Sequence, residues 1–138
     1  MTTLNLQVSA NNDDAHEDQA GTGFDAGTNN CLAFSDSVAG NRDISGHRLT
    51  SVTVPKGADI ITATIQIWPT NTSSDDVNID IFAEDVDDAV DFSTDPDVFS
   101  RVLTSASVSW VANSIGNTGF VTSPEIKAVI QEIVDRGS

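Results

Sequence analysis

The chain contains few basic residues. Six Lys and Arg accompany 21 Asp and Glu among its 138 residues, which gives a formal net charge of −15, and residues 57–100 contain neither Lys nor Arg. Nucleic acid would be repelled by this charge, so we expect no direct nucleic-acid partner. The surplus of carboxylates is consistent with exposure to high salt, with divalent cation sites, or with a position on a basic partner protein.

Long apolar runs and cysteine pairs are also missing. No run approaches the ~20 apolar residues that cross a bilayer, so we expect no membrane-spanning helix and no membrane partner. The first residues, MTTLNLQVSANNDD, contain neither the basic segment nor the apolar core of a secretory signal, and we expect none. Cys31 is the only cysteine, which excludes an internal disulfide, and we interpret it as a small buried side chain.

Several segments alternate apolar and polar residues, with the period of a half-buried strand. The clearest is 59–69, where Ile or Ala occupies every second position from Ile61 to Ile67. Residues 11–30, by contrast, are polar and rich in glycine, which indicates a loop. Strands are predicted over residues 3–10, 31–36, 47–55, 59–69, 76–84 and 100–112.

One helix is predicted, over about residues 123–136. Ser123 as N-cap and Pro124 at the first helical position mark its start, and apolar residues recur at helical spacing as far as Val134. Several short strands followed by one amphipathic helix are typical of a mainly β fold. We therefore predict a single domain over residues 1–138, an antiparallel β-sandwich with the C-terminal helix packed over one edge or end.

Catalytic motifs are missing as well. The two histidines, His16 and His47, lie in no hydrolase or metalloprotease motif, and the sequence has no nucleophile elbow and no phosphate-binding glycine loop. A glycosidase needs two carboxylates positioned by a scaffold, whereas the acids here cluster in two segments. We predict no catalytic residue and a protein that is not an enzyme.

The two acidic segments have two interpretations. They are either solvated loops, the plainer interpretation, or sites for a structural calcium ion, which binds six to eight oxygen atoms from flexible loops. Neither segment has the spacing of an EF-hand, and we expect no cofactor other than this calcium. The candidate calcium ligands are Asp13, Asp14, Glu17 and Asp18 in the first segment, and Glu84, Asp85, Asp87 and Asp88 in the second.

The two tryptophans are predicted to differ in exposure. Trp110 lies in the segment SVSWVA and is interpreted as a core residue. Trp68 falls on the polar face of its predicted strand, directly before Pro69. An exposed tryptophan can anchor a protein interface or stack on a sugar ring, so Trp68 is the candidate residue for an interface or glycan contact.

Four segments occur in the order of a known pattern: RLTSVTVPKGADIITATIQIW, VNIDIFAEDVDDAVDFS, TSASVSWVA and TSPEIKAVIQEIVDRG. Together they resemble a jelly-roll-like β-sandwich domain that is found in tailed-phage virion proteins and bacterial surface proteins and is similar to carbohydrate-binding modules. The resemblance covers about residues 45–137, and the acidic residues 13–18 match a segment near the start of the pattern. It implies a non-catalytic module.

The resemblance also implies a setting. We expect a structural protein located in the virion of a tailed phage, either a capsid decoration (cement) subunit or a tail or fibre component that acts by subunit adhesion. Its partners would be other virion proteins, capsid or tail subunits, and further copies of itself in a homo-oligomer. Longer relatives continue with more strands after the helix. Either a smaller sandwich closes without those strands, or another chain covers the open sheet edge, or the chain is part of something longer such as a fibre. The alternative is a carbohydrate-binding module that recognises a host surface glycan.

Overall fold

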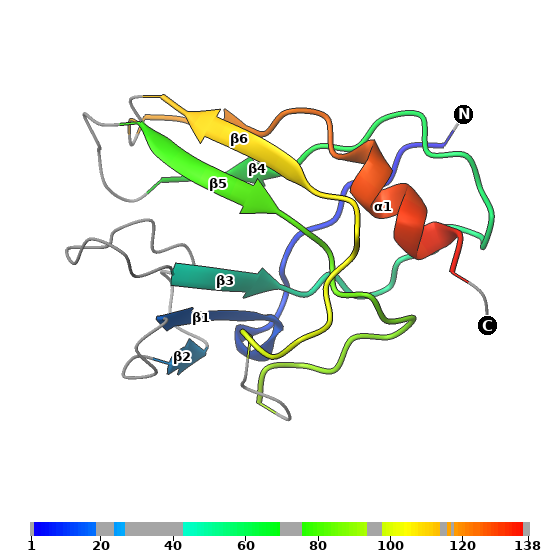
Figure 1. The fold of residues 1–138 in the computed structure, drawn as a ribbon, viewed down its shortest axis with the longest axis horizontal. Coiled ribbons are helices and arrows are strands. Elements are labelled where there is room, and N and C mark those ends of the chain that lie inside the picture. The colour runs from blue at the N-terminus through cyan, green and yellow to red at the C-terminus, as the bar shows by residue number, and fades with distance from the viewer. Residues whose placement is uncertain are drawn as a thin grey trace. The chain divides into compact units, whose positions relative to one another are not determined.

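The computed structural model groups the chain into two compact units. Unit 1 consists of Met1–Thr53 and Asp88–Arg101, and unit 2 of Val54–Asp87 and Val102–Ser138. The fold is mostly β, with small antiparallel sheets and one short C-terminal helix (Figure 1). The single domain stays a prediction. The structure describes residues 2–18, 24–26 (backbone only), 43–69, 76–93, 98–113, 116 and 118–136.

Unit 1 contains a three-stranded antiparallel sheet in the order β2–β1–β3 (Figure 1). In the central strand, Ala15 is fully buried and pairs in register with Gly46 of β3. Ala15, Phe92 and Val98 form the core of this unit, and Ile44 packs against them. The elements of unit 1 are η1 (Asn11–Asp13), β1 (Asp14–Asp18), β2 (Phe24–Ala26) and β3 (Asp43–His47).

Gly46 allows the Phe92 ring to approach the sheet closely. A Cβ atom at position 46 would lie 2.3 Å from Phe92 Cζ, well inside the normal separation of nonbonded carbon atoms. The ring also lies under the Arg101 guanidinium, whose central carbon is 4.4 Å from the ring centroid. The absence of a side chain at position 46 therefore sets the position of the largest core residue of unit 1.

The predictions for the N-terminal part of unit 1 are wrong. The sequence predicts a loop over residues 11–30, whereas η1, β1 and β2 lie there. β1 has the acidic sequence DAHED but needs only one apolar inward side chain, Ala15, because its polar side chains remain partly exposed. The strand predicted over residues 3–10 does not form, since these residues have no partner strand within the described chain.

The strand predicted over residues 47–55 is also wrong. β3 ends at His47, where that prediction begins, and no strand follows it up to residue 55. Ser51 has a φ of 59°, which is left-handed backbone and cannot continue an extended strand. The strand predicted over 31–36, together with Cys31, lies outside the described residues.

Unit 2 contains two antiparallel strand pairs and the helix (Figure 1). The strands β5 (Val77–Ile81) and β6 (Val108–Ala112) pair over their whole length, inside the segments predicted as strands. Trp110 in β6 is 7% exposed, so its predicted core position is confirmed. The second pair joins β4 (Gln66–Ile67) and β7 (Val121–Thr122).

The predicted strand over residues 59–69 is reduced to β4. Three backbone N–H groups of the predicted strand that precede β4 donate to side chains in or just before the C-terminal helix. These groups are therefore satisfied without a neighbouring strand. The donors and acceptors are Ile60 N–H to Gln131 Oε1 at 2.8 Å, Ala63 N–H to Glu125 Oε1 at 2.6 Å, and Ile65 N–H to Ser123 Oγ at 3.0 Å.

The helix α1 (Lys127–Val134) begins later than predicted. Its N-cap residue, Ile126, makes no side-chain capping bond. Ser123, the predicted N-cap, instead accepts the Ile65 N–H, and its hydroxyl donates to the Pro124 carbonyl at 2.8 Å. Ser123 therefore does not cap the helix but joins the chain after β7 to the chain before β4.

Helix α1 holds two further segments of unit 2. The Glu132 carboxylate accepts the N–H groups of Ala106 at 2.7 Å and Ser105 at 2.8 Å, and these bonds lower its pKa. The Gly57 N–H donates to the Val134 carbonyl at 3.0 Å. A single short helix thus supplies partners to backbone groups that no sheet satisfies.

The described residues include no helix of the length and apolar character that a bilayer span requires. The described sheets form no closed barrel. The architecture of small antiparallel sheets with one C-terminal helix agrees with the predicted mainly β fold, whereas the sandwich stays a prediction.

Candidate interaction site

An exposed aromatic pair lies beside the β4–β7 strand pair in unit 2. Trp68 follows β4 directly and Phe120 precedes β7, so the antiparallel register places them opposite each other. Their ring centroids are 5.1 Å apart, and the ring planes meet at 84°, an edge-to-face contact. Trp68 is 54% exposed and Phe120 is 64% exposed. The predicted exposure of Trp68 is confirmed, and a second aromatic residue accompanies it.

The segments that carry this pair contain no charged residue. Residues 60–74 and 102–124, which we call the uncharged segments, include β4, β6 and β7 but no Asp, Glu, Lys, Arg or His. In a chain of net charge −15 such gaps are unusual. Further apolar residues of these segments are exposed: Ile61, Ile65, Val102, Leu103 and Val111.

The exposed residues of these segments have the composition of a protein contact. Interface cores are depleted in charged residues and enriched in tryptophan and phenylalanine, whereas scattered single apolar residues are ordinary. The Trp68 and Phe120 rings support each other, so little side-chain freedom would be lost when they are covered. The arrangement can bind an apolar surface or the face of a sugar ring.

The carboxylates of the first acidic segment have several protein partners. Asp13 is buried, and its Oδ1 lies 2.8 Å from Arg48 Nη1, an ion pair that raises the pKa of Arg48. Glu17 Oε2 accepts the N–H groups of Val98 at 2.8 Å and Phe99 at 3.1 Å. The remaining candidates, Asp14 and Asp18, are half-buried in β1.

The second acidic segment is tied to the end of α1. Arg136 Nε donates to Asp87 Oδ1 at 2.7 Å, and Arg136 Nη1 donates to both the carboxylate and the carbonyl of Asp85. These partners raise the pKa of Arg136, with Asp87 contributing most. Glu84 forms an isolated bridge with Leu103, and Asp88 is exposed.

Among the described residues, no group of three or more His, Cys, Asp or Glu side chains is arranged as metal ligands. Asp13, Glu17, Asp85 and Asp87 instead accept hydrogen bonds from protein groups. A calcium ion at either segment stays a prediction, because ion binding there would have to compete with these bonds or use the remaining oxygen atoms.

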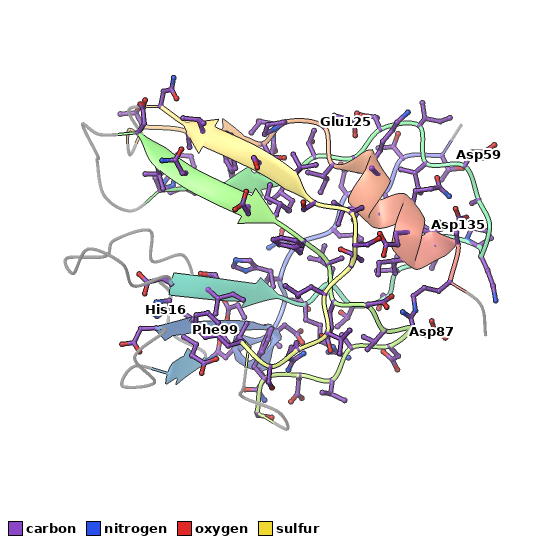
Figure 2. The ribbon with its side chains drawn as sticks, in the orientation of Figure 1. His16, Asp59, Asp87, Phe99, Glu125 and Asp135 are labelled. Carbon is purple, nitrogen blue, oxygen red and sulfur yellow. The ribbon has the colours of Figure 1, made fainter. Side chains whose placement is uncertain are left out.

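The histidines lie in the sheet of unit 1. His16 (Figure 2) has its Nε2 3.7 Å from Asp43 Oδ1, beyond hydrogen-bond distance. His47 pairs in register with Asp14. Phe99, which is labelled with His16 in Figure 2, is 40% exposed. The non-enzymatic character stays a prediction.

Sequence reasoning missed Phe120 and the extent of the surface around it. Period-2 alternation does not single out Phe120, because it lies outside every predicted strand. The distribution of charge provides a signal: both partners of the aromatic pair lie in the two uncharged segments. Searching an acidic sequence for stretches without charge would have found them together.

Comparisons of the chain with protein-family models, with curated proteins and with solved structures give no match.

Proposed function

We propose that this chain is a non-enzymatic structural protein of a tailed-phage virion, a capsid decoration subunit or a tail or fibre component. In this proposal the small sheets belong to a jelly-roll-like β-sandwich, and the protein acts by adhesion between subunits. The observation that carries the proposal is the exposed Trp68–Phe120 pair, both of whose residues lie in the uncharged segments. Tryptophan is among the residues that most often dominate the binding energy of protein interfaces.

The contact we propose joins two copies of the chain through this surface. The uncharged segments contribute no carboxylate of their own, so a contact through them adds less charge repulsion between copies than a contact through the acidic segments does. Elsewhere the surplus of acidic residues keeps copies apart and the protein soluble. Removing half-exposed Trp and Phe side chains from water contributes about 25 cal/mol per Å² of apolar surface. Loss of a central aromatic residue commonly costs about 2 kcal/mol or more of binding free energy.

The first experiment is to measure the mass of the purified chain in solution by light scattering, across protein concentrations and from low to high salt. We expect an oligomer that becomes tighter as salt rises, because salt screens the repulsion between acidic copies and leaves the apolar contact intact. Trp68→Ala and Phe120→Ala should each weaken the association tenfold or more, which corresponds to about 1.4 kcal/mol.

Phe82→Ala is the matched control. Phe82 is also a half-exposed phenylalanine of unit 2, at 43%, but it lies outside the uncharged segments. Its loss should leave the association unchanged. A monomer at all concentrations, or an oligomer equally weakened by all three changes, would contradict the proposed contact. Repeating the measurement with calcium and with EDTA tests the predicted calcium ion, whose removal should lower the mass if it holds the contact.

The second candidate is a carbohydrate-binding module, and the exposed Trp68 ring favours it. Stacking on a sugar face needs an accessible indole, and Trp110 cannot supply one because it is buried. NMR titration of the labelled chain with bacterial surface polysaccharides separates the candidates. A saturable shift of the Trp68 indole N–H in a monomer supports glycan binding, whereas an unchanged indole together with self-association supports adhesion.

A further inference from the structure

We infer that a groove between residues 59–61 and α1 binds a cationic side chain, that of an arginine presented by a partner protein. The groove has a volume of about 530 Å³, and its lining includes Asp59 and Asp135 (Figure 2). Both carboxylates belong to unit 2, one on the extended chain before β4 and one directly after the helix. This site does not involve the Trp68–Phe120 pair.

Hydrogen bonds fix the walls of the groove. Gln131 projects from α1, and its Oε1 accepts the Ile60 N–H at 2.8 Å while its Nε2 donates to the Ala58 carbonyl at 3.1 Å. The same Nε2 donates to Asp135 Oδ1 at 2.9 Å. The bonds of Gln131 therefore hold the extended chain at a set distance from the helix and orient one of the two carboxylates.

The electrostatics favour a cation. Both hydrogen atoms of the Gln131 amide are already donated, so this side chain offers no donor to an anionic ligand. Asp59 and Asp135 contribute two negative charges to the lining, and Lys127 contributes one positive charge. Because Asp135 uses Oδ1 for Gln131, its Oδ2 remains to accept a bond from a ligand.

The groove also offers apolar surface for the stem of a long cationic side chain. Ile61 lines it and is 63% exposed, and Ala128 lines it from the helix. Arginine and lysine bury their methylene groups along such surfaces while their charged ends pair with carboxylates. Arginine suits this lining better than lysine does, since its planar guanidinium presents several N–H groups in a fixed geometry to carboxylate oxygen atoms.

The same chemistry already occurs within the chain. Arg48 pairs with Asp13, and Arg136 pairs with Asp85 and Asp87. These arginines are committed to their own partners, and the chain has only six basic residues against 21 acidic ones. An arginine for the groove is therefore best supplied by another protein, one whose basic surface complements the net charge of −15.

The test is an NMR titration of the ¹⁵N-labelled full chain with N-acetyl-L-arginine amide. N-acetyl-L-citrulline amide, which has nearly the same shape but no charge, serves as the control probe. We expect saturable shifts at the amides of Ile60, Ile61 and Gln131 with the arginine probe only. Asp59→Asn and Asp135→Asn should each weaken binding about threefold to fivefold, the change that an exposed charge pair can account for.

Asp76→Asn controls for the general attraction of a cation to an acidic protein. Asp76 is exposed in unit 2 but does not line the groove, so its replacement should leave the affinity unchanged. Equal weakening by all three variants, shifts scattered over other acidic positions, or the same response to citrulline would overturn the inference. Trp68→Ala should leave this titration unaltered, so failure of the proposed adhesion and failure of the groove can be distinguished.

Discussion

Replacing Gly46 with alanine should destabilise unit 1 through a single steric contact. The new Cβ would lie 2.3 Å from Phe92 Cζ and 2.7 Å from Cε1, whereas ordinary contact begins at 3.4 Å. The ring would therefore have to move by at least about 1.1 Å, the difference between 3.4 and 2.3 Å. Phe92 is only 4% exposed and packs in the core with Ala15 and Val98, so little room exists for that movement.

The expected loss is about 1–3 kcal/mol of the free energy of unfolding. Overpacking of a core costs about 1–3 kcal/mol. Displacing the ring from the Arg101 guanidinium adds up to about 1 kcal/mol. Alanine also restricts the unfolded chain more than glycine does, and this effect alone raises the free energy of unfolding by about 0.4–1 kcal/mol. Gly119→Ala isolates that last effect, because no atom lies within 4 Å of a Cβ built there.

Urea unfolding followed by far-UV circular dichroism measures the effect. For a slope of about 2 kcal/mol per M, a loss of 2 kcal/mol lowers the midpoint by about 1 M. Both tryptophans lie in unit 2, so fluorescence recorded in parallel reports whether that unit unfolds in the same transition. Phe92→Leu should relieve the clash, so that Gly46→Ala costs less in the double variant than alone. Strictly additive losses, or a midpoint equal to that of Gly119→Ala, would refute the steric argument.

Other changes should separate the remaining contacts. Trp110→Ala should cost about 3–5 kcal/mol in the same urea assay, because this ring is buried in β6. Arg48→Met should lower the midpoint by leaving the buried Asp13 carboxylate unpaired, and adding Asp13→Asn should restore much of the loss. Folding lowers the pKa of Glu132 below its ordinary 4.5. The contribution of this carboxylate to the free energy of unfolding is therefore complete above pH 4.5 and is lost as the pH falls through the lowered pKa. The urea midpoint should therefore decrease when the pH is lowered below about 4.5, and this decrease should be smaller in Glu132→Gln. An equal decrease in the variant and the unmodified protein would contradict the role assigned to Glu132.

The sequence predicts well the two strands β5 and β6 of unit 2. β5 and β6 lie inside predicted segments, and their inward positions include Trp110 as expected. The alternation of side chains is decisive there because both strands have one buried and one exposed face. The C-terminal helix is also predicted correctly, since its apolar residues recur at helical spacing. It begins later than predicted because Ser123, the predicted N-cap, bonds to Ile65 instead.

The failures occur where polar side chains replace the usual partners. Residues 60–65 have the pattern of a strand but bond to Gln131, Glu125 and Ser123, and no local pattern encodes such distant acceptors. β1 has the composition of a loop but is a strand, because β2 and β3 pair with it on both sides while only Ala15 among its side chains is fully buried. For the candidate site, one of the two aromatic residues was predictable, because only Trp68 lies in a predicted strand.

The interleaving of the two units has a consequence for the order of folding during synthesis. Every residue of unit 1, up to Arg101, is made before the last segment of unit 2, and domains made first generally fold first. Unit 2 must wait for α1, since Gly57 and Ser105 bond to Val134 and Glu132. During that interval residues 60–68 have been synthesised but lack their partners, and they carry no charge to prevent association. Association of nascent chains through this segment should therefore increase when synthesis is slowed after residue 124.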